Sequence, residues 1–242
     1  MNRLFKASII YLSYFILTSV AHAGDKTSFQ KFLYIGGEAG LVEPVQRKFQ
    51  HKESKTDLTL KKSAMYSGKI GYSFYPNMAI EFSATYHPRY RLAYVLPEKD
   101  MGNGHPIPKT PGQTKVVSNI YMVNLIYDLK SLNGFTPFVI MGAGLAQVKV
   151  KSASSSWSSM EFFKVNTTKT NCFAWQAGIG ISKNITENFS LDVTAKLQAI
   201  HNIKAKYDTF DLPSAKFVPA SPIKKTIGVG EFGIGFTYKL FN

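Results

Sequence analysis

Enzymatic chemistry in this chain would have to come from its histidine, serine and acidic side chains, and of these the histidines are few. The histidines beyond residue 23 are His51, His87, His105 and His201. Ester hydrolysis would need a Ser-His-acid set, and a metal would need His, Cys or acidic ligands at short spacings. The sequence has no His-x-Ser pairing, no cluster with metal-ligand spacing and no glycine-rich phosphate loop that opens a helix. We therefore expect no enzyme activity and no cofactor.

Charged side chains recur instead on one face of extended segments. In the stretch EFGIGFTYKLFN, large apolar side chains take every second position, and Glu231, glycines and Lys239 lie between them. An alternation of period two predicts a β-strand with two unlike faces. Isolated charges on a face that points into a narrow interior are costly unless they pair. We predict a barrel-interior ion-pair network centred on Glu38, Lys69, Glu81, Asp192, Lys196 and Glu231.

Eight segments carry this alternation, and they are the elements that must position the charges. Their approximate ranges are 32–43, 65–75, 78–91, 116–128, 136–150, 171–183, 189–203 and 227–241. Short links follow the even-numbered segments, and one of them contains Asn133-Gly134, which is typical of a tight turn. Long polar links follow the odd-numbered segments, at about 44–64, 92–115, 151–170 and 204–226. Alternating long and short links predict antiparallel strands that run up and down.

The two faces of these segments distinguish a soluble barrel from a membrane barrel. A soluble lipocalin-like barrel hides its apolar side chains inside, and a membrane barrel turns them outward. Here the bulky aromatic groups share one parity, and the other parity is small, polar or charged, as in Phe173 and Trp175 against Gln176 and Gly178. An eight-stranded interior is just wide enough for side chains, so the bulky groups should face lipid. The predicted fold is all-β, an eight-stranded antiparallel up-and-down transmembrane β-barrel.

The charged interior of such a barrel has two possible roles. The charges either line a gated pore or fill the interior and fix the packing and register of the strands. We favour the filled interior, because paired charges are less costly in a narrow space than unpaired ones.

The first 23 residues are typical of a secretory signal peptide. Basic residues precede an apolar run at 7–20, and an A-x-A cleavage site ends at Ala23. The run is shorter than the roughly 20 apolar residues that a membrane-spanning helix needs. We expect a signal peptide at 1–23 and a barrel domain at 24–242.

The formal net charge of +14 comes mostly from the four long links. A positive field there would attract acidic protein segments, sulfated glycans or lipopolysaccharide phosphates, unless the links only counter the anionic outer leaflet. The third and fourth links are neighbours in an up-and-down order. We predict a shared partner-binding surface of Lys149, Lys151, Lys164, Lys169, Lys204, Lys206, Lys216, Lys224 and Lys225. Trp157 would add an apolar anchor, if it does not simply pack onto the barrel rim.

Three runs resemble a known family: GKIGYSFYPNMAIEFSATY, FTPFVIMGAGLAQV and AWQAGIGISKNITENFSLDVTAKLQ. They are similar to the small eight-stranded outer-membrane barrels related to the transmembrane domain of outer membrane protein A and to the opacity proteins. Within that family, the chain looks most like the rickettsial outer-surface adhesins. The resemblance covers 24–242 and implies a monomeric barrel in the bacterial outer membrane, surrounded by lipid and lipopolysaccharide, with its long loops exposed at the cell surface.

The resemblance also implies a function in adhesion. Adhesins of this group bind host surface or serum proteins, including vitronectin, so the implied roles are host attachment and resistance to serum complement. These roles would make the chain a virulence factor and a surface antigen. Nucleic acid is not an expected partner, because an exported membrane barrel rarely meets it. The alternative is a non-adhesive structural barrel or a small porin of the outer membrane.

Overall fold

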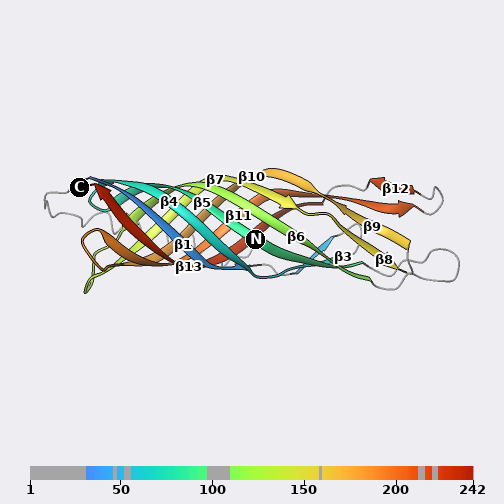
Figure 1. Ribbon diagram of the computed structural model, residues 1–242, viewed down its shortest axis with the longest axis horizontal. Coiled ribbons are helices and arrows are strands. Elements are labelled where there is room, and N and C mark those ends of the chain that lie inside the picture. Colours follow the sequence, from blue (N-terminus) through green and yellow to red (C-terminus); the bar gives the residue numbers. More distant parts are fainter. Residues whose placement is uncertain are drawn as a thin grey trace, which may run out of the picture.

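The computed structural model describes residues 31–45, 48–51, 56–96, 110–157, 160–211, 216–219 and 223–241. Eight long strands form a closed antiparallel barrel (Figure 1), and they are β1 (Phe32–Pro44), β4 (Ser63–Tyr75), β5 (Met78–Leu96), β6 (Thr110–Asp128), β7 (Phe135–Val150), β10 (Thr168–Asn184), β11 (Phe189–Asp211) and β13 (Ile223–Phe241). Each long strand pairs with the next one along the chain, and β1 pairs with β13 to close the barrel. The predicted fold is confirmed. The predicted signal peptide lies outside the described residues.

Five short strands extend beyond one end of the barrel, at the right of Figure 1, and they are β2 (Lys48–His51), β3 (Thr56–Leu60), β8 (Ala153–Trp157), β9 (Met160–Asn166) and β12 (Lys216–Pro219). Strands β5 and β11 continue into this region and pair with β3, β9 and β12. Parts of the segments expected as polar links are therefore strands. These strands have four to seven residues each, too few to show the sustained alternation of the barrel strands, but their backbone N–H and C=O groups still need partners.

The opposite end of the barrel carries the short turns. Between β6 and β7, Asn133 and Gly134 have φ angles of 51° and 79°, and Leu132 and Phe135 exchange backbone hydrogen bonds of 2.8 and 2.9 Å. Two consecutive residues with positive φ form the turn that best matches the twist of paired strands, and asparagine and glycine adopt this conformation at low cost. The long segments and the short turns thus lie at opposite ends of the barrel.

The outer surface of the barrel is apolar. Along β13, Phe232 is 59% exposed and Ile234 is 69% exposed, whereas Glu231 is 1% exposed. The same alternation of exposed apolar and buried small or polar residues recurs on β4, β5, β10 and β11. Among the described residues, no helix is long and apolar enough to span a membrane. The exposed apolar side chains form a surface that suits contact with lipid and would be unfavourable in water.

The interior has an apolar layer toward the end with the long segments. It is formed by buried side chains from all eight barrel strands, which include Val42, Met65, Tyr90, Ile120, Met122, Val148, Cys172, Ile200 and Val229. Polar and charged side chains fill the interior on the side of the short turns.

Glycines make room for two inward aromatic rings in the polar part of the interior. A Cβ atom at Gly71 would overlap the ring of Tyr34, and a Cβ atom at Gly180 would overlap the ring of Phe138. Both rings are buried. The interior therefore accepts large side chains where the facing strand carries no side chain.

Candidate functional site

One branch of the interior charge network is centred on Lys196 of β11. Its Nζ atom lies 3.0 Å from the Glu38 carboxylate of β1 and 3.7 Å from the Glu231 carboxylate of β13. Thr194 donates a second hydrogen bond of 2.6 Å to Glu38. Lys196 is only 7% exposed, so its charge is compensated by protein groups rather than by bulk water.

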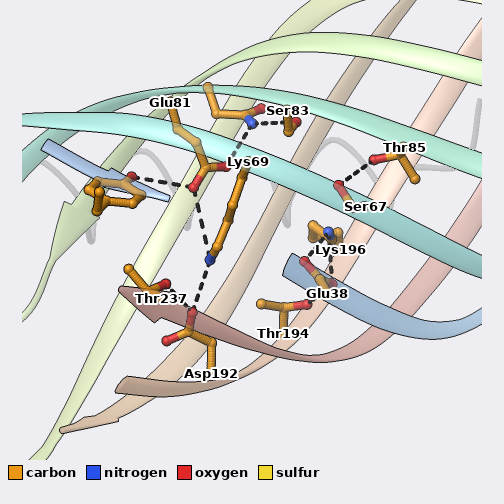
Figure 2. A network of polar contacts seen from close by, with 12 residues as sticks. Glu38, Ser67, Lys69, Glu81, Ser83, Thr85, Asp192, Thr194, Lys196 and Thr237 are labelled. Atoms are coloured by element: carbon orange, nitrogen blue, oxygen red, sulfur yellow. Dashed lines mark hydrogen bonds and ion pairs between the residues drawn. The ribbon is translucent and has the colours of Figure 1, made fainter. Parts of the chain in front are cut away.

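A second branch is centred on Lys69 of β4 (Figure 2). Its Nζ atom lies 2.9 Å from Asp192 of β11 and 4.0 Å from Glu81 of β5. Thr237 donates a hydrogen bond of 2.6 Å to Asp192, and the Tyr34 hydroxyl donates one of 3.3 Å to Glu81. The six residues of the predicted network thus lie in two branches of alternating charge, which link five barrel strands across the interior.

Polar side chains without charge extend the second branch, and the predicted network left them out. Gln176 of β10 donates a hydrogen bond of 2.6 Å to Asn124 of β6. Asn124 in turn donates to Glu81 at 3.2 Å and to Ser83 at 3.0 Å. Parity already placed Gln176 on the inward face, and it could have added Asn124, which lies between the exposed Val123 and Leu125. The network therefore reaches β6 and β10 as well.

His87 is the centre of a third group of polar contacts, which resembles the Ser-His-acid arrangement of a hydrolase. Its Nδ1 atom lies 3.0 Å from the Ser118 hydroxyl and 2.8 Å from the Tyr90 hydroxyl, and its Nε2 atom lies 3.1 Å from Glu231. Catalysis would require access for a substrate, but Ser118, His87 and Glu231 are all at most 1% exposed. Among the described residues, no group of three or more His, Cys, Asp or Glu side chains could hold a metal ion. These contacts therefore support a structural role for His87.

The candidate lysines lie at the end of the barrel with the long segments. Lys149 and Lys169 are in register on β7 and β10, and Lys204 and Lys224 are in register on β11 and β13. The strand β9, which carries Lys164, pairs with β11, which carries Lys206. Lys149 is half-buried, and the exposed lysines are Lys151, Lys164, Lys169, Lys204, Lys206, Lys216, Lys224 and Lys225. The third and fourth long segments are thus hydrogen-bonded to each other.

Trp157 ends β8 and pairs through its backbone with Met160 of β9. Its side chain lies outside the described part of the structure. The expected role of Trp157 as an anchor remains a prediction.

The chain is similar to known proteins over most of its length. The family model for the outer membrane protein beta-barrel domain matches residues 12–239. An uncharacterized protein of Rickettsia prowazekii (strain Madrid E) is 57% identical over 178 residues, which cover 73% of this chain and 99% of that protein. Outer membrane protein PagN of Salmonella typhimurium is 36% identical over 87 residues, or 35% of each chain. The crystal structure of the outer membrane protein OprG from Pseudomonas aeruginosa matches with a TM-score of 0.50 and 17% identity, over 88% of this chain and 96% of that chain.

Proposed function

Because the chain belongs to the family of outer membrane protein β-barrel domains, we propose that it is a surface adhesin of the bacterial outer membrane that binds a host protein. The observation that carries this proposal is the joining of the third and fourth long segments into one basic surface through the pairing of β9 with β11. The barrel holds this surface rigidly above the membrane, and binding needs no catalytic step.

The charge of this surface supports an acidic partner. Lys204 and Lys224 lie directly opposite each other on adjacent strands, and like charges in that position repel. Lys206 on the same strand as Lys204, and Lys164 and Lys216 on the neighbouring strands β9 and β12, add exposed positive charge. An acidic segment of a partner would relieve the repulsion, and the positive field would raise the rate of encounter.

The resemblance to rickettsial adhesins supports a host surface or serum protein as the partner, with vitronectin as the specific candidate. Attachment to the host cell and protection against serum complement would follow from that binding. Trp157 at the tip of the β8–β9 hairpin would supply an aromatic anchor beside the lysines, as aromatic residues do in many interfaces.

Binding of purified vitronectin to the refolded barrel tests the proposal. Replacing Lys204 and Lys224 by glutamine should weaken the binding roughly 10-fold, and added salt should weaken it further. The matched control replaces Lys31 and Lys130, two exposed lysines at the end with the short turns. This control removes the same charge and should leave the binding unchanged. No binding above that of an unrelated barrel, with vitronectin or with other serum and cell-surface proteins, would refute the adhesin proposal.

The alternative function, a small porin, predicts an open lumen. Met65, Ile120, Met122 and Val148 are each at most 1% exposed in the apolar layer, and the ion pairs fill the interior beside them. We therefore expect little or no conductance from the refolded chain in a planar bilayer. A stable single-channel conductance would favour the porin.

A further inference from the structure

The outer wall formed by β6, β7 and β10 changes from apolar to polar in a regular order. Strand pairing places one residue of each strand in a row, with the three side chains on the same face of the sheet. The first row is apolar and exposed and contains Tyr121, Leu145 and Phe173. The next row toward the long segments carries three amides, Asn119, Gln147 and Asn171. Apolar contact with lipid thus gives way to groups that donate and accept hydrogen bonds.

A basic row follows the amides. Lys149 and Lys169 lie opposite each other, with Val117 beside Lys149 on β6. Lys115 and Lys151 face the same outer surface just beyond this row, where the Lys151 N–H donates a backbone hydrogen bond of 2.8 Å to the Lys115 carbonyl. We refer to the apolar row, the amide row and the basic row together as the lipid wall.

The basic row lies at the height where lipid headgroups begin. On β6, Val117 in the basic row lies ten residue steps from Tyr127, near the short turn. At about 3.3 Å per residue along a strand tilted by about 40°, they span a height of roughly 25 Å. The apolar band of an outer-membrane barrel is about 25 Å tall. Lys149 and Lys169 therefore lie at its outer border.

The described residues give these lysines no acidic partner. The only acidic residue in β6, β7 and β10 is Asp128, which lies at the opposite end of β6. The ion pairs of the described residues leave out Lys115, Lys149, Lys151 and Lys169. Lysines that face each other across strands repel, so an external anion would stabilise this arrangement.

The other side of the barrel lacks the same order of chemistry. Beyond Leu197 of β11, Ala199 is in register with Gly228 of β13, and the pairing is then irregular between Ile200 and Ile203. The basic pair Lys204 and Lys224 lies beyond this irregularity, so no row of amides in register leads to it. On β1, Glu43 is in register with Gly230. A general attraction of the barrel to anionic lipid would need only positive charge. The order of apolar, amide and basic rows on this one wall therefore points to a specific site.

We propose that the lipid wall binds one phosphorylated and acylated glycolipid of the outer leaflet, the lipid A portion of lipopolysaccharide. The acyl chains lie on Tyr121, Leu145 and Phe173. The sugar hydroxyls meet the amide row, and a phosphate lies between Lys149 and Lys169, where both ammonium groups can donate to it. This proposal uses the membership of the chain in an outer-membrane family and the order of rows on the lipid wall. It does not depend on the adhesin function. In this proposal Lys149 and Lys169 bind lipid, whereas the candidate lysines on β9, β11 and β13 remain available to a protein partner.

Native mass spectrometry of the refolded chain in detergent micelles tests the site. The two probes are bis-phosphorylated lipid A and a dephosphorylated lipid A with the same acyl chains. We expect the chain to bind the phosphorylated form preferentially. Replacing Lys149 and Lys169 by glutamine should weaken that binding roughly 30-fold, from the usual contribution of two basic residues beside anionic lipid. Replacing both by arginine, which keeps the charge, should preserve it.

The matched control replaces Lys204 and Lys224, a lysine pair that is also in register but lies on the opposite wall. It removes the same charge and should leave lipid A binding unchanged. Equal binding of the two lipid probes, or equal weakening by the two double substitutions, would overturn the proposal, because either result indicates non-specific attraction. Circular dichroism of each variant verifies that the barrel is folded. Vitronectin binding should depend on Lys204 and Lys224 and not on Lys149 and Lys169, which is the reverse of the expectation for lipid A. Failure of one proposal is therefore distinguishable from failure of the other.

Discussion

Replacement of Lys196 by methionine should destabilise the folded barrel by about 3–5 kcal/mol, the usual cost of removing one partner from a buried ion pair. Methionine is also long and unbranched, so it leaves little empty volume. It leaves the carboxylates of Glu38 and Glu231 without the ammonium group that lies 3.0 and 3.7 Å from them. Urea unfolding of the refolded chain in lipid vesicles, followed by tryptophan fluorescence, measures the change in the free energy of unfolding.

The control for this substitution is an exposed ion pair in the same protein. Lys62 lies 3.0 Å from Glu43, and its side chain is 63% exposed. Replacing Lys62 by methionine should cost less than about 1 kcal/mol, because water and salt already screen that pair. Similar free energies of unfolding for the two variants would contradict the view that the interior charges depend on one another.

Replacement of Gly71 by alanine should destabilise the barrel by about 1–3 kcal/mol, the usual cost of adding a methyl group to a filled interior. The new Cβ atom would overlap the buried ring of Tyr34, which also donates a hydrogen bond to Glu81. Gly68 on the same strand is the matched control, because a Cβ atom there would have nothing within 4 Å. Urea unfolding in vesicles should show a loss for the first substitution and little change for the second.

A double-mutant cycle tests whether the Tyr34 ring causes this loss. In a chain that already carries Tyr34→Ala, the overlap no longer exists, so Gly71→Ala should cost much less than in the natural chain. If the cost stays the same in both backgrounds, the glycine is required by the backbone of β4, and our account of the interior packing is wrong.

Much of the fold could be predicted because the lipid imposes a strict alternation on each strand. The expected segments 65–75 and 136–150 agree within two residues with the strands Ser63–Tyr75 and Phe135–Val150. The prediction was less complete beyond the membrane. There β5 continues to Leu96 through LAYVL, which is apolar on both faces, and β11 continues to Asp211 through KAKYDTFD, which has polar residues on both faces.

The contacts between interior side chains could not be predicted from the periodic pattern of single strands. Parity indicated that Lys69 and Asp192 face inward, but their contact of 2.9 Å depends on how strands 123 residues apart are staggered. The inward ring of Phe138 depends on the missing side chain of Gly180 on a neighbouring strand, which is a property of a pair of strands. His87 lies beside an irregularity in the pairing of β5 with β6, where simple counting fails.

The pairing of β1 with β13 also constrains how the barrel can assemble. Glu38 lies opposite Gly235, and nearly the whole described chain separates these two positions. Contacts between residues so distant in sequence make folding slow, because the chain loses much conformational entropy before they form. Until the seam closes, both edge strands present unpaired backbone groups, which cannot enter hydrocarbon without a large cost. Insertion into the membrane and closure of the seam must therefore be coupled, and a chain that stalls before closure has two free edges for aggregation.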